Sequence, residues 1–217
     1  MGAEAVIFDF DYTLADSSIG AIECVNYALE AIGLPATSAE AIRRTIGLPL
    51  SDIFLKLVGR QHTGRYGEFL SLFVQRSDEV MADNTIVFES VPSVVKALKS
   101  NGVVLGIAST KFRYRIETIL GRERLLDLFD VIVGGEDVLN HKPDPEALLT
   151  AVKRLACSPS GCLYVGDSVT DAETAARAEV PFVAVLSGVT PREEFRSYPT
   201  YAILGDLTGL PGLAVSG

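Results

Sequence analysis

The sequence has no long apolar segment and little cysteine. No apolar run approaches the roughly 20 residues that a membrane-spanning helix needs, which argues against an integral membrane protein. The first residues, MGAEAVIFDF, include no basic segment followed by a cleavage site, so we expect no signal peptide. The 3 cysteines, Cys24, Cys157 and Cys162, include no CxxC pair, which favours reduced thiols over disulfides or a zinc site. These absences predict a cytoplasmic protein.

An excess of basic residues is also missing. The 28 acidic and 19 basic residues give a formal net charge of −9, which argues against non-specific nucleic-acid binding. An anionic substrate is still compatible with this charge, because a bound cation can reverse the local field. The 217 residues are 48% hydrophobic and 22% charged, an ordinary globular composition for one or two domains with a buried core. We expect neither a nucleic-acid nor a membrane partner.

Short apolar runs recur along the chain and alternate with helical patterns. The runs are nearly continuous in apolar residues, as in parallel strands that are covered on both faces. They are Ala5–Phe10, Val103–Ser109, Val131–Val133, Leu163–Val165, Phe182–Leu186 and Tyr201–Leu204. Between them, apolar residues recur at helical spacing, for example at Val91, Val94, Val95 and Leu98. The alternation predicts an α/β fold, a doubly wound parallel sheet with a Rossmann-like core.

One stretch, residues 16–87, breaks this alternation. It contains helical patterns and no evident strand, so we expect an inserted all-helical domain after the first strand. The core would then comprise residues 1–15 and 88–217. Because ligands of open parallel sheets bind beyond the carboxyl ends of the strands, an insertion that leaves this edge is expected to act as a lid. We expect the tail, Gly209–Gly217, to be loose.

Polar clusters lie at or near the ends of four predicted strands. They are Asp9–Leu14, Ser109–Lys111, His141–Pro145 and Gly166–Asp171. An isolated Asp after a strand is often only a turn residue or a helix cap. Together, however, the clusters bring four carboxylates, a lysine and hydroxyl groups to one sheet edge. Clustered carboxylates resist ionisation, and a hard divalent cation such as Mg²⁺ is the natural counter-charge.

The four clusters resemble a known set of ordered motifs. DFDYTLADS, IASTK, HKPDP and VGDSVTD are similar to the four motifs of the haloacid dehalogenase superfamily of aspartate-nucleophile phosphatases. The helical insertion resembles that superfamily's cap of the first type, and TIGLPL, residues 45–50, resembles the cap segment of phosphoglycolate phosphatases and their pyrophosphatase relatives. The resemblance covers essentially the whole chain. It implies a Mg²⁺-dependent phosphomonoesterase that acts on a small phosphorylated metabolite.

The resemblance implies two catalytic carboxylates. Asp9 is expected to be the nucleophile that forms an aspartyl phosphate. Asp11 is expected to protonate the leaving alcohol and then to deprotonate the hydrolytic water. A true haloacid dehalogenase lacks an acid at the position of Asp11, so the chain is expected to be a phosphatase rather than a dehalogenase.

The resemblance also implies a phosphate site. Ser109 and Thr110, with nearby backbone N–H groups, are expected to bind phosphate oxygens. Lys142 is expected to neutralise the charge that the phosphoryl group shares with Asp9. Lys111, Arg113 and Arg115 either attract phosphate or belong to a solvated helix face.

The implied metal ligands are acidic. Asp9, the backbone carbonyl of Asp11, and Asp167 are expected to hold Mg²⁺. Asp171 lies one helical turn beyond Asp167, so both can face the same site. We expect Asp171 to act in support, through water or through Lys142.

Three alternatives stay open at this point. An inorganic pyrophosphatase or a sugar-phosphate mutase can use the same scaffold. The mutases hold their distal phosphate with an Arg shortly after the cap Gly, and by the spacing from Gly47 this position is Leu50, although Arg43 and Arg44 lie nearby. A phospho-aspartate signalling switch has similar residues at a sheet edge, but it is much shorter and gains nothing from the acid–base group Asp11.

Overall fold

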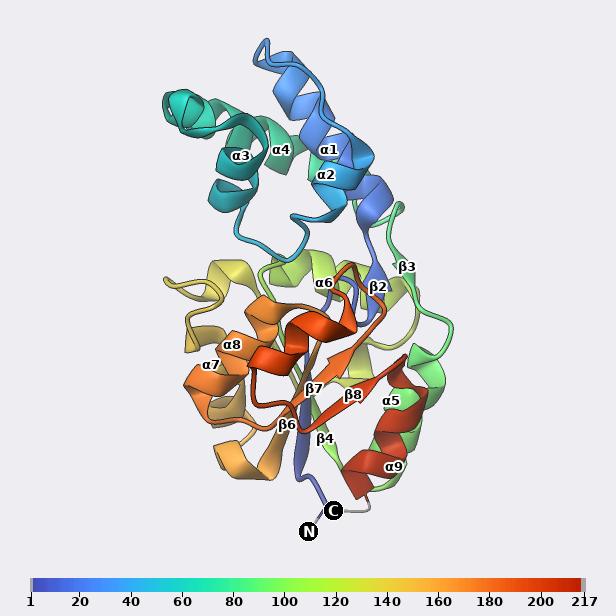
Figure 1. Ribbon diagram of the computed structural model, residues 1–217. Coiled ribbons are helices and arrows are strands. Elements are labelled where there is room, and N and C mark those ends of the chain that lie inside the picture. Colours follow the sequence, from blue (N-terminus) through green and yellow to red (C-terminus); the bar gives the residue numbers. More distant parts are fainter. Residues whose placement is uncertain (1, 216–217) are drawn as a thin grey trace. The chain divides into compact units, whose positions relative to one another are not determined.

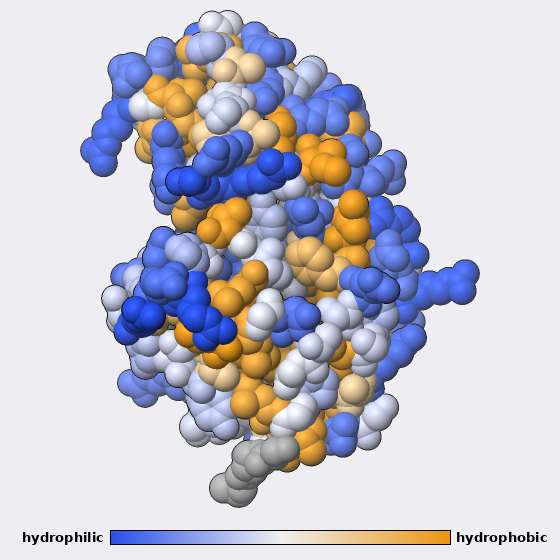
Figure 2. Space-filling model, turned by 45° about the vertical axis from the view of Figure 1, so that its right-hand side comes forward, coloured by the Kyte–Doolittle hydropathy of each residue, from blue (hydrophilic) through white to orange (hydrophobic). Residues whose placement is uncertain are grey.

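The computed structural model describes residues 2–215. The chain forms two compact units. One combines Met1–Ala15 with Val87–Gly217, and the other is Asp16–Ile86. Each unit has its own hydrophobic core. No helix of the described residues is long and apolar enough to cross a membrane, and on the face shown in Figure 2 apolar residues are interspersed with hydrophilic ones.

The first unit is built on a six-stranded parallel sheet. Its order is β5-β4-β1-β6-β7-β8, as expected for a doubly wound α/β fold. The strands are β1 (Ala5–Phe8), β4 (Val104–Ala108), β5 (Val131–Val133), β6 (Cys162–Gly166), β7 (Phe182–Val185) and β8 (Ala202–Leu204). The predicted fold class is therefore confirmed. Several strands end before the predicted boundary, since the polar residues that follow turn out of the ladder.

Helices cover both faces of this sheet. They are α5 (Val91–Ser100), α6 (Arg113–Arg122), α7 (Glu146–Arg154), α8 (Val169–Ala178) and α9 (Leu210–Val215), with 3-10 turns η2 (Leu126–Leu128), η3 (Gly135–Asp137), η4 (Pro159–Gly161), η5 (Arg192–Ser197) and η6 (Leu207–Gly209). Figure 1 shows α7 and α8 on one side and α5 and α9 on the other. Side chains alternate along β1, so Ala5 and Ile7 pack in the cluster with α7 and α8, while Val6 and Phe8 face the opposite layer.

The tail prediction was wrong for the described residues. Residues 210–215 form α9, which packs against α5. Leu210 and Ala214 of this helix are buried. Apolar residues at helical spacing outweigh the one glycine of this segment, Gly212. Residues 216 and 217 of the predicted tail lie outside the described residues.

The second unit consists of helices. They are α1 (Ser18–Ala31), α2 (Ala39–Arg43), α3 (Leu50–Val58), η1 (Arg60–Arg65) and α4 (Tyr66–Val80). Their apolar faces meet in one core, in which the rings of Phe54 and Phe69 lie 4.9 Å apart and those of Phe69 and Phe73 lie 5.9 Å apart. The insertion of α1–α4 after β1 was predicted from the sequence, and the structure confirms it.

Two short strands mark the chain's passages between the units. β2 (Ala15–Asp16) and β3 (Ile86–Val87) form a two-stranded sheet of their own. The sequence analysis expected no strand within residues 16–87, so it missed this pair. Strands of two residues are too short to show a period in the sequence.

The sheet order determines where the polar clusters lie. β1 is flanked by β4 and β6, so the segments that follow these three strands are neighbours at the carboxyl edge of the sheet. The segment His141–Pro145 enters α7, which packs against β5, β4 and β1. Four separate parts of the chain therefore meet at the edge where parallel α/β sheets bind ligands.

Candidate active site

Asp9 is held at the end of β1. Its backbone N–H donates to the carbonyl of Val165 at 2.8 Å, which extends the pairing with β6 by one residue. The chain then turns sharply, with Tyr12 in the left-handed region at φ 59° and its N–H donating to Ala15 at 2.7 Å. The hydroxyl of Ser187 donates to the Tyr12 carbonyl at 2.6 Å. A non-glycine residue at positive φ is costly, and these bonds keep the turn in this conformation.

Three buried carboxylates gather beside this turn. Ligand oxygens of Asp9, Asp167 and Asp171 all lie within 4.8 Å of one another. The ammonium group of Lys142 is 2.9 Å from Asp9 Oδ1 and 2.7 Å from Asp171 Oδ1. The Lys142 side chain is only 2% exposed, so these charges interact with little screening. The structure thus brings together four residues that the sequence analysis placed in one site.

Burial and mutual repulsion shift the pKa values of this cluster. Burial raises the pKa of Asp9 to about 6; Lys142 opposes the shift, and Asp171 adds to it. Burial, then Asp171 and Asp9, raise the pKa of Asp167 well above its usual value. Burial disfavours the charge of Lys142, but Asp171 and Asp9 more than offset it, so the pKa of Lys142 is raised. The carboxylates therefore need more positive charge than Lys142 alone supplies.

Asp171 is fully engaged by hydrogen bonds. Its Oδ1 accepts from Lys142 at 2.7 Å and lies 3.0 Å from the hydroxyl of Tyr164, which can donate either to it or to the Ala108 carbonyl. Its Oδ2 accepts from the Ser168 hydroxyl at 2.6 Å, as part of a capping box at the start of α8. These contacts favour a role in positioning Lys142 over direct metal ligation.

Asp11 forms a separate ion pair with Lys111. The Lys111 ammonium lies 2.9 and 3.2 Å from the two carboxylate oxygens of Asp11. The two side chains are 6% and 10% exposed. Lys111 therefore does not lie on a solvated helix face, one of the two interpretations of the sequence. Arg115 is also buried and packs on the rings of Phe112 and Tyr114.

The predicted phosphate-binding hydroxyls follow β4. Ser109 is buried and Thr110 is half-buried. The Lys111 N–H donates to Ser109 Oγ at 3.3 Å. Since β4 is adjacent to β1, both residues lie at the same sheet edge as Asp9.

The acidic cluster fits a hard divalent cation. Asp9 Oδ1 is buried, and its contact among the described residues is the ion pair with Lys142 at 2.9 Å. Asp167 Oδ1 has one long hydrogen bond, 3.4 Å, from Thr13. Carboxylate oxygens with unused acceptor capacity are the ligands that Mg²⁺ prefers. Asp9 and Asp167 are therefore the side chains best placed to hold a metal.

The absence of a side chain at Gly188 leaves room for the Asp167 carboxylate. A Cβ atom at Gly188 would lie 1.9 Å from Asp167 Oδ2. That contact is far inside van der Waals distance, so any side chain here would displace the carboxylate. This glycine, on the segment after β7, is thus part of the cluster's geometry.

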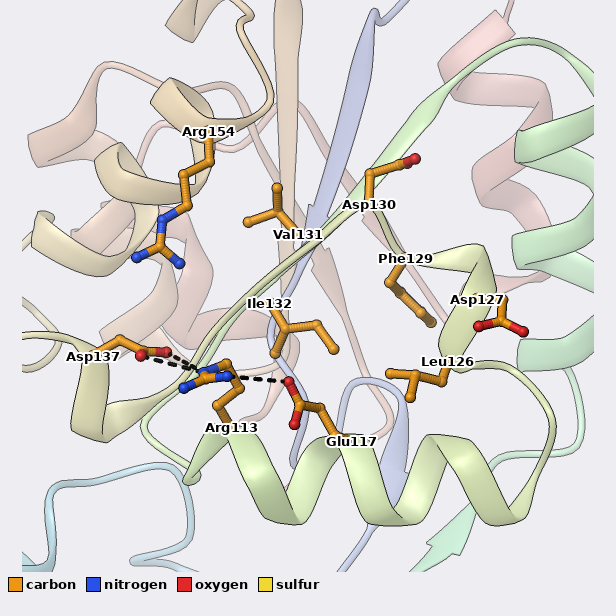
Figure 3. A pocket seen from close by; sticks show the side chains of 10 residues that line it. All are labelled: Arg113, Glu117, Leu126, Asp127, Phe129, Asp130, Val131, Ile132, Asp137 and Arg154. Atoms are coloured by element: carbon orange, nitrogen blue, oxygen red, sulfur yellow. Dashed lines mark hydrogen bonds and ion pairs between the residues drawn. The ribbon is translucent and has the colours of Figure 1, made fainter.

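A cavity of about 720 Å³ lies elsewhere in the same unit, beside the edge strand β5. None of the ten residues that line it belongs to the predicted site. Figure 3 shows Arg113 in this cavity, paired with Asp137 and Glu117. Of the two interpretations of Arg113, attraction of phosphate therefore has no support in its contacts.

Sequence reasoning missed two polar contacts of the site. Tyr164 was regarded only as part of an apolar strand, although a buried hydroxyl needs a partner and was the available signal. The Lys111 pair with Asp11 was missed because the direction of a side chain after a strand cannot be derived from spacing. Both residues come from the strands that flank β1 or the segments that follow them.

Comparison with known proteins agrees with this geometry. A family model described as haloacid dehalogenase-like hydrolase matches residues 6–185. Phosphoglycolate phosphatase of Salmonella typhimurium is 30% identical over 209 residues, which cover 84% of this chain and 81% of that protein. The Escherichia coli phosphoglycolate phosphatase is 29% identical with the same coverage. A crystal structure from Bacteroides fragilis, described as a haloacid dehalogenase-like hydrolase, is 43% identical, has a TM-score of 0.92 and covers 96% of this chain and 99% of that one.

We expect Gly188→Ala to weaken Mg²⁺ binding by about ten- to a hundredfold, because the added methyl group displaces the Asp167 carboxylate. Isothermal titration calorimetry with Mg²⁺ measures the change. Gly205→Ala is the matched control, since a Cβ at Gly205 meets nothing within 4 Å. Equal Mg²⁺ affinity in the two variants would contradict the assignment of Asp167.

Proposed function

The chain belongs to the haloacid dehalogenase-like hydrolases, and we propose that it is a Mg²⁺-dependent phosphomonoesterase that works through an aspartyl phosphate. The observation that carries this proposal is the buried Asp9 carboxylate at the end of β1, with Lys142, Asp167 and Asp171 around it. The contact of Asp9 Oδ1 among the described residues is the ion pair with Lys142, so this oxygen keeps acceptor capacity for a ligand. The 30% identical phosphoglycolate phosphatase supports the reaction class.

In the first half-reaction, an Asp9 oxygen attacks phosphorus and the bond from phosphorus to the ester oxygen breaks. Asp11 gives its proton to that oxygen, and the alcohol leaves. Asp11 follows Asp9 across a bend at Phe10, and the two carboxylates have separate partners, Lys142 and Lys111, so we infer that they can reach different sides of the phosphoryl group.

In the second half-reaction, Asp11 takes a proton from water, and the water oxygen attacks the phosphorus of the aspartyl phosphate. The bond from phosphorus to Asp9 breaks, which releases orthophosphate and restores the carboxylate. The proton returns to Asp11, so the cycle consumes one water and one ester. The same residue serves as acid and then as base, because the second step repeats the first in reverse with water in place of the alcohol.

Charge stabilisation comes from residues around the phosphoryl group. A Mg²⁺ held by Asp9, the Asp11 carbonyl and Asp167 would neutralise part of the phosphate charge. Lys142 places a buried ammonium beside Asp9, and Asp171 holds it there. Ser109 and Thr110 would donate hydrogen bonds to the phosphate oxygens that remain. Phosphoryl transfer needs mainly positioning and charge stabilisation of this kind.

The helical unit would serve as a cap domain, spanning residues 16–87, that chooses the substrate. Leu50 begins α3 and follows Gly47, which has φ 92°. An apolar residue at this position offers no fixed charge to a second phosphate, which favours small monophosphates such as phosphoglycolate. A second phosphate without a counter-charge would be costly in a closed site.

The alternative reactions have weaker support. A pyrophosphatase or a sugar-phosphate mutase uses the same acidic cluster, and nothing in that cluster separates them from a phosphomonoesterase. The apolar Leu50 is what favours hydrolysis over the mutase reaction. A signalling switch is disfavoured by Asp11, because a switch gains by keeping its phosphate.

We expect Asp9→Asn to abolish phosphate release, since an amide cannot attack phosphorus. Asp11→Asn should retain binding but lose roughly 10²–10⁴-fold in kcat. Phosphate release from p-nitrophenyl phosphate measures both, with Asp83→Asn on the exposed surface of the helical unit as the control. Turnover by Asp9→Asn in a clean preparation would disprove the nucleophile assignment.

We expect a chelator to stop turnover and added Mg²⁺ to restore it. Ca²⁺ should substitute poorly, because its looser coordination shell lets both Asp9 oxygens bind the metal and blunts the nucleophile. The rate of phosphate release in each condition is the measurement. Full activity in excess chelator is incompatible with the metal site.

Product analysis separates hydrolysis from the mutase reaction. Incubation with a hexose 1-phosphate and a trace of the bisphosphate should give free phosphate or no reaction. The matching variant Leu50→Arg should shift preference towards doubly phosphorylated substrates. Stoichiometric hexose 6-phosphate from the wild-type protein would identify a mutase instead.

A further inference from the structure

Tyr164 carries a hydroxyl group in an otherwise apolar strand. It is the third residue of β6, whose sequence is CLYVG and whose residues are all buried. Its side chain packs in the apolar cluster that includes residues of α7 and α8, and its ring lies 6.1 Å from that of Phe182. A phenylalanine would fill the same space without a polar group that must be satisfied. Packing therefore does not account for the hydroxyl.

The Tyr164 hydroxyl reaches the active site from β6 across β1. It lies 3.1 Å from the carbonyl oxygen of Ala108, at the end of β4, although β1 separates β4 from β6. It also lies 3.0 Å from Asp171 Oδ1. A hydroxyl has one hydrogen, and a carboxylate is a stronger acceptor than a carbonyl, so donation to Asp171 is favoured. Burial, and then the charge of Asp171, raise the pKa of Tyr164 well above its usual value, so the hydroxyl remains a donor.

The ring of Tyr164 contacts Lys142. The Lys142 ammonium lies 5.3 Å from the centre of the ring, within the range of a cation–π interaction. The same ammonium lies 2.7 Å from Asp171 Oδ1, the oxygen that the Tyr164 hydroxyl also contacts. Tyr164, Asp171 and Lys142 thus form a triangle in which each side chain contacts the other two. All three side chains are buried.

The position of the Lys142 ammonium is important because the group contacts Asp9 as well. An ammonium has three N–H donors, and the contacts with Asp9 and Asp171 can occupy two of them. The third is available to an oxygen of the phosphoryl group that Asp9 attacks. Lysine has a long and flexible side chain, so the direction of this donor depends on the contacts around the ammonium. Charge stabilisation is effective only where such a donor is already in place.

We propose that Tyr164 is a positioning residue for phosphoryl transfer: its hydroxyl holds Asp171 and its ring supports Lys142, which keeps the ammonium beside Asp9. This inference rests on the proposed phosphomonoesterase function. Tyr164 acts through Asp171 and Lys142 and does not itself touch the phosphoryl group. Because the charge of Lys142 matters most while the bond between Asp9 and phosphorus forms, loss of the hydroxyl should lower kcat more than it raises KM.

Removal of the hydroxyl alone tests this role. Tyr164→Phe keeps the ring and its packing, and Tyr198→Phe is the matched control, because Tyr198 packs against the same apolar cluster. kcat and KM are measured with p-nitrophenyl phosphate and Mg²⁺. We expect Tyr164→Phe to lose roughly tenfold in kcat with KM changed by less than about threefold. Tyr198→Phe should match the wild-type protein, and a wild-type kcat in Tyr164→Phe would overturn the proposal.

A double-mutant cycle separates positioning from a purely structural role. If the hydroxyl acts through Asp171, Tyr164→Phe should change kcat by less than about twofold once Asp171→Ala has removed the carboxylate. A role in the fold alone predicts the same loss of kcat with and without Asp171→Ala, and that result would overturn the proposal. Thermal unfolding shows whether each variant is folded at the assay temperature. If Tyr164→Phe is not, Tyr164→Met, which also lacks the hydroxyl, is measured in the same way.

The proposed function can fail independently. A wild-type protein that hydrolyses p-nitrophenyl phosphate, with a Tyr164→Phe variant that is equally fast, is a phosphatase in which Tyr164 has no positioning role. A wild-type protein that releases phosphate from neither p-nitrophenyl phosphate nor phosphoglycolate contradicts the proposed function, and the role of Tyr164 falls with it.

Discussion

Like-charged carboxylates buried at one edge of a parallel sheet are the constraint on which the rest of the site depends. Ligand oxygens of Asp9, Asp167 and Asp171 lie within 4.8 Å of one another, and burial, opposed by Lys142 and reinforced by Asp171, raises the pKa of Asp9 to about 6. With Asp11 they outnumber the two lysines of the site by two negative charges. A divalent cation would balance this excess. Without a bound cation, the repulsion among these carboxylates destabilises the folded protein. The same arrangement is suited to binding a metal together with a phosphate.

Much of the fold follows from the sequence because buried parallel strands leave a strong signal. Continuous apolar runs located the six strands, and helical spacing located α5. The ends of β1, β4 and β7 were placed too far along; Asp9 and Ser109 each keep one backbone hydrogen bond to the neighbouring strand but lie outside the strands. β2 and β3 carry too few residues for a period, and α9 is held by contacts with α5 that lie far away in the sequence.

The sequence predicts which segments form the site, but it predicts fewer of the contacts between their side chains. Four motifs in order identified the residues that the sheet brings together, and their catalytic roles stay predictions. The partner of Lys111 was not derivable, because it depends on the direction of a long side chain in a folded loop, whereas the family resemblance had implied that Lys142 lies with Asp9 and Asp171. For Asp171 the sequence analysis expected a supporting role through water or through Lys142, and in the structure its oxygens contact Lys142, Tyr164 and Ser168.

The paired strands β2 and β3 have a consequence for how such a chain can diverge. Because β2 and β3 pair with each other, the two ends of the 71-residue insertion Asp16–Ile86 lie side by side. Lengthening or replacing such an insertion costs little chain entropy and leaves the strand order of the sheet unchanged. All four acidic residues and both lysines lie outside it. Mutations in the insertion and mutations in the acidic cluster are therefore exposed to different selective pressures within one polypeptide.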